Sequence, residues 1–189
     1  MFYLSNWPVK LAFMAMLPLA AIANNTANSP HSYYCGDALV EAENLQNIVP
    51  TLYSIVSGPA GAKHDWDLLR KLFAPEAYIT PVFHDADKPV IRPLTADAFI
   101  ALNKELFKNQ GFFETEIDSQ MIRVGHMATV VSLYESREHP EAKPYSSGVN
   151  SFQLLNDGRR WCVVSVTWDS DKGGHVMPTR INLGKGEKY

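Results

Sequence analysis

The residues of this chain that best suit proton-transfer chemistry lie in its N-terminal half. An imidazole and a carboxylate follow one another in the segment His64-Asp65-Trp66-Asp67, and His84 and Tyr53 are further groups able to move a proton. We therefore take His64, Asp65, His84 and Tyr53 as the candidate catalytic residues. A structural interpretation stays open, because acids favour the start of a helix, His84 lies in a turn-like segment and Tyr53 fits the core face of a helix.

No local pattern indicates metal or nucleotide chemistry. Neither His64 nor His84 is followed by a second histidine at the i, i+4 spacing of a helical metal site, and the chain has no cluster of cysteine and histidine. The sequence also lacks a phosphate-binding loop, a dinucleotide fingerprint and a G-x-S-x-G nucleophile turn. We expect no metal and no cofactor.

The net charge limits the kinds of partner that the chain can bind, and the length indicates the number of domains. The 189 residues carry a formal net charge of -3, and no basic run is longer than Arg159-Arg160, so the chain lacks the electrostatic footprint of a nucleic-acid partner. This length, with 46% hydrophobic residues, suits one globular domain with a core of its own.

The N-terminus has the pattern of a secretory signal peptide over residues 1–23. Lys10 precedes the apolar run Leu11–Ala23, which ends in Ala21-Ile22-Ala23. A membrane span needs about 20 residues, so this shorter run predicts cleavage and no stable membrane anchor, although an uncleaved anchor is the alternative. We expect a periplasmic or secreted protein with a flexible leader at 24–36, a folded domain at 37–172 and a loose tail at 173–189.

Export changes how the two cysteines are interpreted. Cys35 and Cys162 both follow the predicted cleavage point, and an oxidising compartment permits a disulfide between them. Two separate thiols are the other interpretation, because spacing alone does not place the two sulfur atoms within reach.

Hydrophobic periodicity predicts helices first and strands later. Asp37 is a candidate N-cap for a first helix with the stripe Leu45, Ile48, Val49, Leu52 and Val56, which Pro50 should interrupt. A second helix opens at His64 or Asp65 and ends before Pro75, and Thr95 caps a third over Ala96–Asn109. Strands are expected at Ala77–Phe83, Phe113–Val124, Ala128–Arg137, Gly148–Leu155 and Trp161–Asp169.

Three segments with this order of elements resemble the nuclear transport factor 2-like superfamily, in particular its SnoaL-like, ketosteroid-isomerase-like and exported bacterial members. They are His64–Ala77, which ends in Leu72-Phe73-Ala74-Pro75-Glu76-Ala77, then Ala128–Glu135, and Gly148–Val166. The resemblance implies an α+β cone in which three N-terminal helices pack on a curved, mostly antiparallel sheet. In that superfamily the cone encloses a pocket used for binding or catalysis, and the outer sheet face commonly forms a homodimer.

Strand parity predicts the wall of such a pocket, because alternate residues of a strand point to opposite faces. If Trp161 faces inward, so does Ser165, and the wall is apolar with a few hydroxyls and one amide. The alternative is that these residues form an ordinary core. The candidate ligand-binding residues are Tyr78, Arg92, Ser132, Tyr134, Asn150, Ser165 and Thr167. The outer face would hold Thr129, Val131, Leu133, Val164, Val166 and Trp168.

The same parity places no carboxylate inside the pocket. Glu114, Glu116 and Asp118 share one face of their strand and have the pattern of a solvated edge, which argues against close ketosteroid-isomerase-like chemistry. Three hypotheses follow. The protein binds a small apolar or aromatic molecule, or it is a lyase or isomerase of the SnoaL-like or dehydratase type, or it is a dimerisation module without catalysis.

Overall fold

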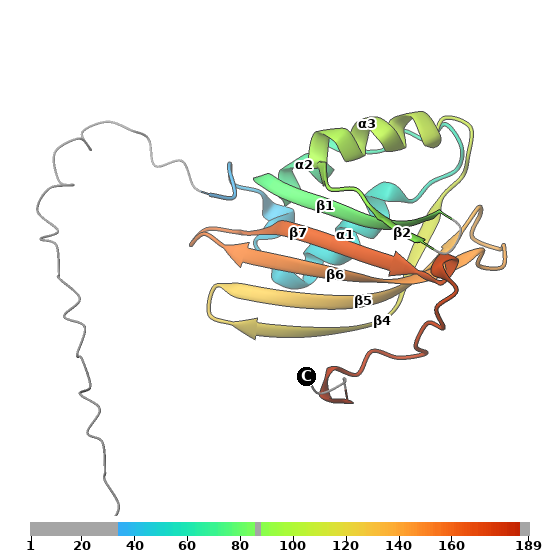
Figure 1. Cartoon of the computed structure of the whole chain (residues 1–189). Coiled ribbons are helices and arrows are strands. Elements are labelled where there is room, and N and C mark those ends of the chain that lie inside the picture. Colours follow the sequence, from blue (N-terminus) through green and yellow to red (C-terminus); the bar gives the residue numbers. More distant parts are fainter. Residues whose placement is uncertain (1–33, 86–87, 186–189) are drawn as a thin grey trace, which may run out of the picture. The chain divides into compact units, whose positions relative to one another are not determined.

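The computed structural model describes residues 34–85 and 88–185 (Figure 1). The predicted signal peptide and residues 24–33 of the predicted leader lie outside this range. No helix within the described ranges is long and apolar enough to cross a membrane. The helical elements are η2 (Val40–Ala42), α1 (Leu45–Val56), α2 (Trp66–Leu72), α3 (Ala96–Leu106), η3 (Asp171–Gly173) and η4 (Leu183–Lys185). The strands are β1 (Phe73–Asp85), β2 (Lys88–Ile91), β3 (Leu94–Thr95), β4 (Phe113–Val124), β5 (Met127–Arg137), β6 (Ser146–Asn156) and β7 (Trp161–Ser170).

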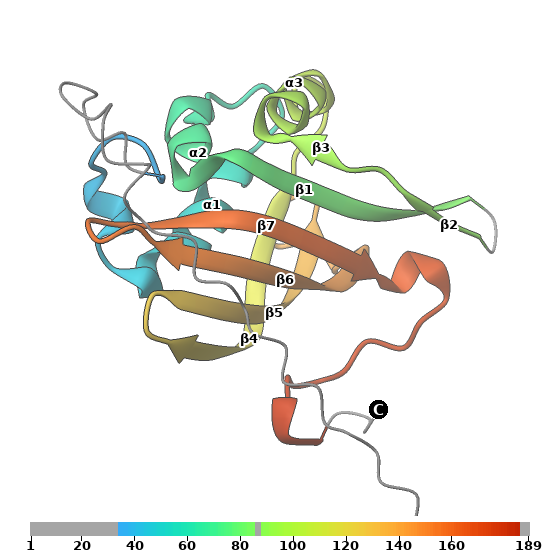
Figure 2. The same ribbon diagram turned by 60° about the vertical axis from the view of Figure 1, so that its left-hand side comes forward.

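One sheet with strand order β2-β1-β7-β6-β5-β4 carries the three α-helices on one face (Figures 1 and 2). The pairing of β1 with β7 is parallel, and the other ladders are antiparallel. α1 packs against β4 and β7, α2 against β1 and β7, and α3 against β1. The α+β prediction of three helices on a curved, mostly antiparallel sheet is confirmed.

The helices begin where side chains cap them. Asn44, and not Asp37, caps α1, because its side-chain oxygen accepts the Gln46 N–H at 3.0 Å. Asp65 caps α2 by accepting the Leu68 N–H at 2.9 Å, and Thr95 caps α3 as predicted. The helix does not restart at Pro50, since α1 continues through it. Pro50 and the preceding turn at Gln46 are exposed, so water can bind the carbonyl that proline leaves unpaired.

A β-bulge in β7 changes which side chains face the helices. Val163 pairs with Leu154, and the next pair on the ladder joins Ser165 to Gln153, so Val164 is an extra residue on β7. Beyond Val164 the alternation is inverted. The residues that share a face with Phe152 and Asn150 are therefore Val166 and Trp168, and these two do not belong to the outer face as predicted. Ser165 and Thr167, predicted to face inward, lie on the outer face.

Part of the segment after β7, for which a loose tail is predicted, contacts the domain through Ile181. The Ile181 N–H donates to Asp118 Oδ2 at 2.8 Å, and Gln120 Nε2 donates to the Ile181 carbonyl at 3.0 Å. Ile181 is 7% exposed. Leu133, which pairs with Asp118, is also buried, so part of the predicted dimer face is covered within one chain.

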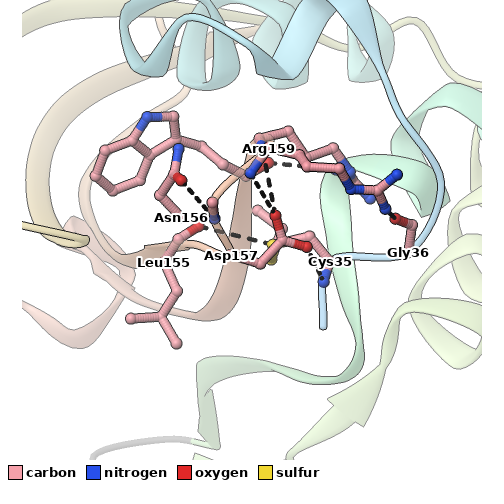
Figure 3. Close-up of a disulfide and its surroundings, with 10 residues drawn as sticks. Cys35, Gly36, Leu155, Asn156, Asp157 and Arg159 are labelled. Atoms are coloured by element: carbon pink, nitrogen blue, oxygen red, sulfur yellow. Dashed lines mark hydrogen bonds between the residues drawn. A yellow bond between two sulfur atoms is a disulfide. The ribbon is translucent and has the colours of Figure 1, made fainter. Parts of the chain in front are cut away.

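The disulfide is present and joins Cys35 to Cys162 with their Cα atoms 5.6 Å apart. Figure 3 shows Cys35 beside the turn between β6 and β7, where its N–H donates to Asp157 Oδ2 at 3.0 Å. Arg159 Nη2 donates to the Gly36 carbonyl at 2.7 Å in the same place. The bridge and these bonds fix the chain from Cys35 onward, ahead of the predicted start at Asp37.

Candidate functional site

A cavity of about 720 Å³ lies between the helices and the concave face of the sheet. Apolar side chains of α1, α3, β1, β6 and β7 make most of its wall. The aromatic residues of the lining are Tyr53, Phe73, Phe83, Phe99, Phe107, Phe112, Tyr134, Tyr145, Phe152 and Trp168. A volume of this size and an aromatic wall suit a ligand of drug-like size with ring character.

A directed chain of hydrogen bonds lies along one wall of the cavity. Asn150 Nδ2 donates to the Tyr53 hydroxyl at 2.9 Å, and that hydroxyl lies 2.7 Å from Ser132 Oγ. Ser132 in turn donates to Glu116 Oε2 at 2.5 Å. Because Ser132 gives its only proton to the carboxylate, Tyr53 must donate to Ser132. Burial, together with the charge of Glu114, raises the pKa of Tyr53 above its usual range, so Tyr53 remains a neutral phenol.

Glu114 brings a carboxyl group into the cavity, contrary to the prediction from parity. A register shift in β4 is the reason: Glu116 pairs with Tyr134, and the next pair joins Asp118 to Leu133, so Ile117 is an extra residue. Glu114 and Glu116 therefore share the inner face with Tyr134. Asp118 lies on the outer face, so the three acids do not share one face.

The carboxyl of Glu114 has an unusual affinity for its proton. Loss of water around the group raises its pKa to about 8, although hydrogen bonding from Ser136 lowers it in part. Tyr53, Tyr134 and Tyr145 lie near enough that burial and then the charge of Glu114 raise the pKa of each phenol. At neutral pH the site therefore holds a mostly protonated carboxyl beside neutral phenols, all of which can donate hydrogen bonds.

Two of the four candidate catalytic residues line the cavity, namely Tyr53 and His84. His64 does not, because its Nδ1 lies 2.7 Å from the Ile55 carbonyl at the end of α1 and its ring packs on Trp66 and Phe107. Asp65 is exposed and caps α2. These contacts of His64 and Asp65 are those that the structural interpretation of the segment expects.

The candidate ligand-binding residues divide in the same way. Tyr134 and Asn150 line the cavity, whereas Ser132 is fully buried behind the lining. Tyr78 is 57% exposed on the other face of β1, and Arg92 lies outside the lining with its guanidinium 6.0 Å from the Phe83 ring. Ser165 and Thr167 are on the outer face because of the bulge at Val164.

Sequence reasoning missed Glu114, Ser136 and Lys172, which all line the cavity. Counting back from the tight turn at Gly125 without a bulge would pair Glu114 with Arg137. The extra residue Ile117 shifts the register by one, so that Glu114 pairs with Ser136. The alternation of Ser132, Tyr134 and Ser136 was the available signal for the serine. Lys172 lies in η3 after β7, and its Nζ donates to the Tyr145 carbonyl at 2.7 Å. No local sequence pattern predicts this contact.

The geometry of the domain is similar to that of known structures. One is a protein of unknown function from Pseudomonas putida KT2440 described as NTF2-like, with a TM-score of 0.52 and 9% identity over 66% of this chain and 82% of that one. Another is a protein of unknown function with a cystatin-like fold from Nostoc punctiforme PCC 73102, with a TM-score of 0.52 and 8% identity over 67% of this chain and 88% of that one. No family model and no curated protein matches the sequence. At these identities the likeness establishes the fold alone.

Proposed function

Since the chain has the nuclear transport factor 2-like fold, we propose that it is an exported protein whose cavity binds a small apolar or aromatic molecule. The observation that carries this proposal is the aromatic wall around about 720 Å³, interrupted by a few polar groups that converge from β4, β5 and β6. Burial of a ring against this wall supplies affinity, and the polar groups select its orientation.

The polar groups favour a ligand with an uncharged oxygen. The Glu114 carboxyl is mostly protonated near neutral pH, since its pKa is raised to about 8, and it donates a hydrogen bond in that form. The neutral phenols of Tyr134 and Tyr145 are donors near it. A carbonyl or hydroxyl oxygen fits this set, and an anionic group is less suited to it because the apolar wall would remove water from its charge.

Export is supported by the signal-peptide pattern and by the disulfide, which an oxidising compartment preserves. Cell fractionation with mass spectrometry of the purified chain tests this part. A chain that starts near Asn24 and is two hydrogens lighter than its dithiol form supports export. A full-length reduced chain in the cytoplasm contradicts it.

Binding is tested with the neutral aromatic probe 1-N-phenylnaphthylamine and a matched pair of variants. Val82 lines the cavity and Val131 lies on the outer face of β5, and both are half-buried. Val82→Trp should weaken probe binding by about tenfold or more, because extra volume in a filled site costs about 1–3 kcal/mol. Val131→Trp should leave it unchanged. Equal affinity in both folded variants would refute the cavity as the binding site.

A second candidate function is a cofactor-independent isomerase or lyase that uses Glu114 as its acid and base. Its support is the position of an ionisable carboxyl inside an apolar cavity with a pKa near neutral pH. In the ionised form Glu114 takes a proton from a carbon next to a carbonyl, and as the neutral acid it returns that proton to a neighbouring carbon. Tyr53 and His84 remain available as further groups of this site, whereas His64 and Asp65 lie outside the cavity.

Hydrogen exchange separates the two functions. Alicyclic and aromatic ketones that displace the probe are incubated with the protein in heavy water, and NMR follows deuterium entering next to the carbonyl. Catalysis is supported if the native protein exchanges the hydrogen and Glu114→Gln does not, while Glu114→Gln still binds the probe with native affinity. The exposed Glu141→Gln is the control and should exchange at the native rate. Tight binding of these ketones without deuterium exchange would support the binding function and contradict the enzymatic one.

A further inference from the structure

We propose that the rim of the cavity holds a binding site for a divalent transition metal ion, formed by His84, Asp169 and His175. His84 comes from β1, Asp169 from β7 and His175 from the segment after η3. Their ligand atoms all lie within 4.8 Å of one another, and no other three such side chains converge in this way in the described parts of the chain. The inference does not depend on the proposed ligand or on catalysis by Glu114.

The distances allow one ion to reach all three groups. His84 Nε2 lies 2.7 Å from Asp169 Oδ1, and His175 Nε2 lies 3.9 Å from Asp169 Oδ2. An ion about 2.0–2.2 Å from each nitrogen and oxygen atom holds tetrahedral ligand atoms about 3.4 Å apart. Small rotations of the His84 and His175 rings therefore suffice, and the metal replaces the hydrogen bond between His84 and Asp169.

The backbone after β7 is built to bring His175 to this place. Gly173 lies directly against the His84 ring, where a Cβ would overlap it, and Gly174 has a φ of +77° that turns the chain. Asp171 accepts hydrogen bonds from Ser146 Oγ at 2.9 Å and Ser147 Oγ at 3.3 Å. These contacts, and the bond from Lys172 to the Tyr145 carbonyl, hold the segment before any ion binds.

The site is open enough for an ion to enter and to keep free coordination positions. The side chain of His84 is 9% exposed, whereas those of Asp169 and His175 are 42% and 59% exposed. His84 and Ser170 also line the main cavity, so an ion here lies at its rim. Three protein ligands leave at least one position for water or for an oxygen atom of a bound molecule.

The ligand set selects the class of ion. Two imidazoles and one carboxylate suit Zn²⁺ and its neighbours in the first transition row, whereas Mg²⁺ and Ca²⁺ prefer oxygen ligands alone. No sequence pattern indicates this site, because residues 84, 169 and 175 come from separate elements and show no helical spacing.

The test is calorimetric titration of Zn²⁺ into the purified protein, prepared without a histidine tag and freed of metal by a chelator. We expect saturable binding of one ion. His175→Ala should lower the affinity at least about tenfold, since even the loss of an outer-shell partner costs about 10–100-fold. The control His126→Ala removes an exposed histidine of the turn between β4 and β5 and should bind zinc as the native chain does.

A second measurement keeps the test decisive if His84 or Asp169 variants lose structure. X-ray absorption of the zinc-loaded protein should show two imidazoles in the first shell, and one should be lost in His175→Ala, an exposed position where folding is not at risk. Absence of saturable zinc binding at micromolar concentration overturns the proposal. So does an affinity that His175→Ala leaves unchanged.

Discussion

The ionisable carboxyl of Glu114 lies among tyrosine rings and apolar side chains. Its neutral form is favoured in the folded state, because water is largely removed from it and no described cation forms an ion pair with it. The unfolded chain exposes the same group to water, where it ionises at about 4.5. The charge state of one residue therefore links folding to pH.

The sign of this linkage makes the protein less stable as pH rises. Between about 4.5 and about 8 the folded state keeps a proton that the unfolded state has lost, so the free energy of unfolding should fall by at most about 1.4 kcal/mol per pH unit across that window. Urea unfolding at a series of pH values measures the slope. Glu114→Gln should flatten it, and Glu141→Gln should not. An unchanged slope in Glu114→Gln would show that Glu114 ionises freely.

Tyr53 is the middle of the hydrogen-bond chain, so its hydroxyl serves two buried partners. Tyr53→Phe leaves Asn150 without its acceptor and Ser132 without its donor, and we expect a loss of about 1–3 kcal/mol in unfolding free energy. Tyr78→Phe removes the hydroxyl of an exposed tyrosine on β1 and should change stability by less than about 0.5 kcal/mol. Equal midpoints in urea for the two variants would mean that the buried chain adds no net stability.

At the scale of elements, the sequence predicted most helices and strands but not how two strands are placed in register. Periodicity of two identifies a strand, and it fixes the faces only if every residue pairs across the ladder. Ile117 and Val164 each add one residue, and each inverts the faces beyond it. Neither bulge has a local signal. Between Val163 and Val166 apolar residues stand at both odd and even positions, so alternation does not locate the bulge, and Ile117 continues an alternation that suits an exposed strand.

Sequence patterns placed a site residue correctly only where they also assigned the right face of its strand. The inner residues Ser132, Tyr134 and Asn150 were placed correctly because β5 and β6 pair with each other without a bulge. Ser165 and Thr167 were placed wrongly because β7 has one. The position of His64 followed from a tertiary contact with the carbonyl of Ile55, which chain order does not reveal.

The C-terminal segment is held to β4 by a few contacts that one substitution can test. Ile181→Ala removes a buried side chain outside the main core, and we expect the segment 176–185 to detach locally while the sheet stays folded. Hydrogen exchange should become faster at the Ile181 and Leu183 amides, which bond to Asp118 and Gln120. Val176→Ala is the control, since Val176 is 95% exposed. Exchange as slow as in the native chain would show that the backbone contacts suffice.

For the whole molecule, the disulfide joins the start of the described domain to its last long strand. Cys35 and Cys162 are separated by 127 residues, so the bridge closes a loop that contains all three α-helices and the strands from β1 to β6. Both cysteines are buried with the core residues, and neither lines the cavity. Its effect should therefore fall on the unfolded chain and not on the shape of the site.

Removal of the bridge tests this separation of stability from binding. In the chain-entropy model a loop of this length contributes about 4–5 kcal/mol, and we expect the double variant Cys35→Ser, Cys162→Ser to lose about 2–5 kcal/mol of unfolding free energy in urea. Affinity for 1-N-phenylnaphthylamine should stay unchanged below the unfolding transition. The native protein should become equally unstable when a reductant is added, and the double variant should not respond to it. If the variant is as stable as the oxidised protein, the chain-entropy model is contradicted. The unfolded chain would then gain little conformational entropy when the bridge is removed, because residual structure already restricts it.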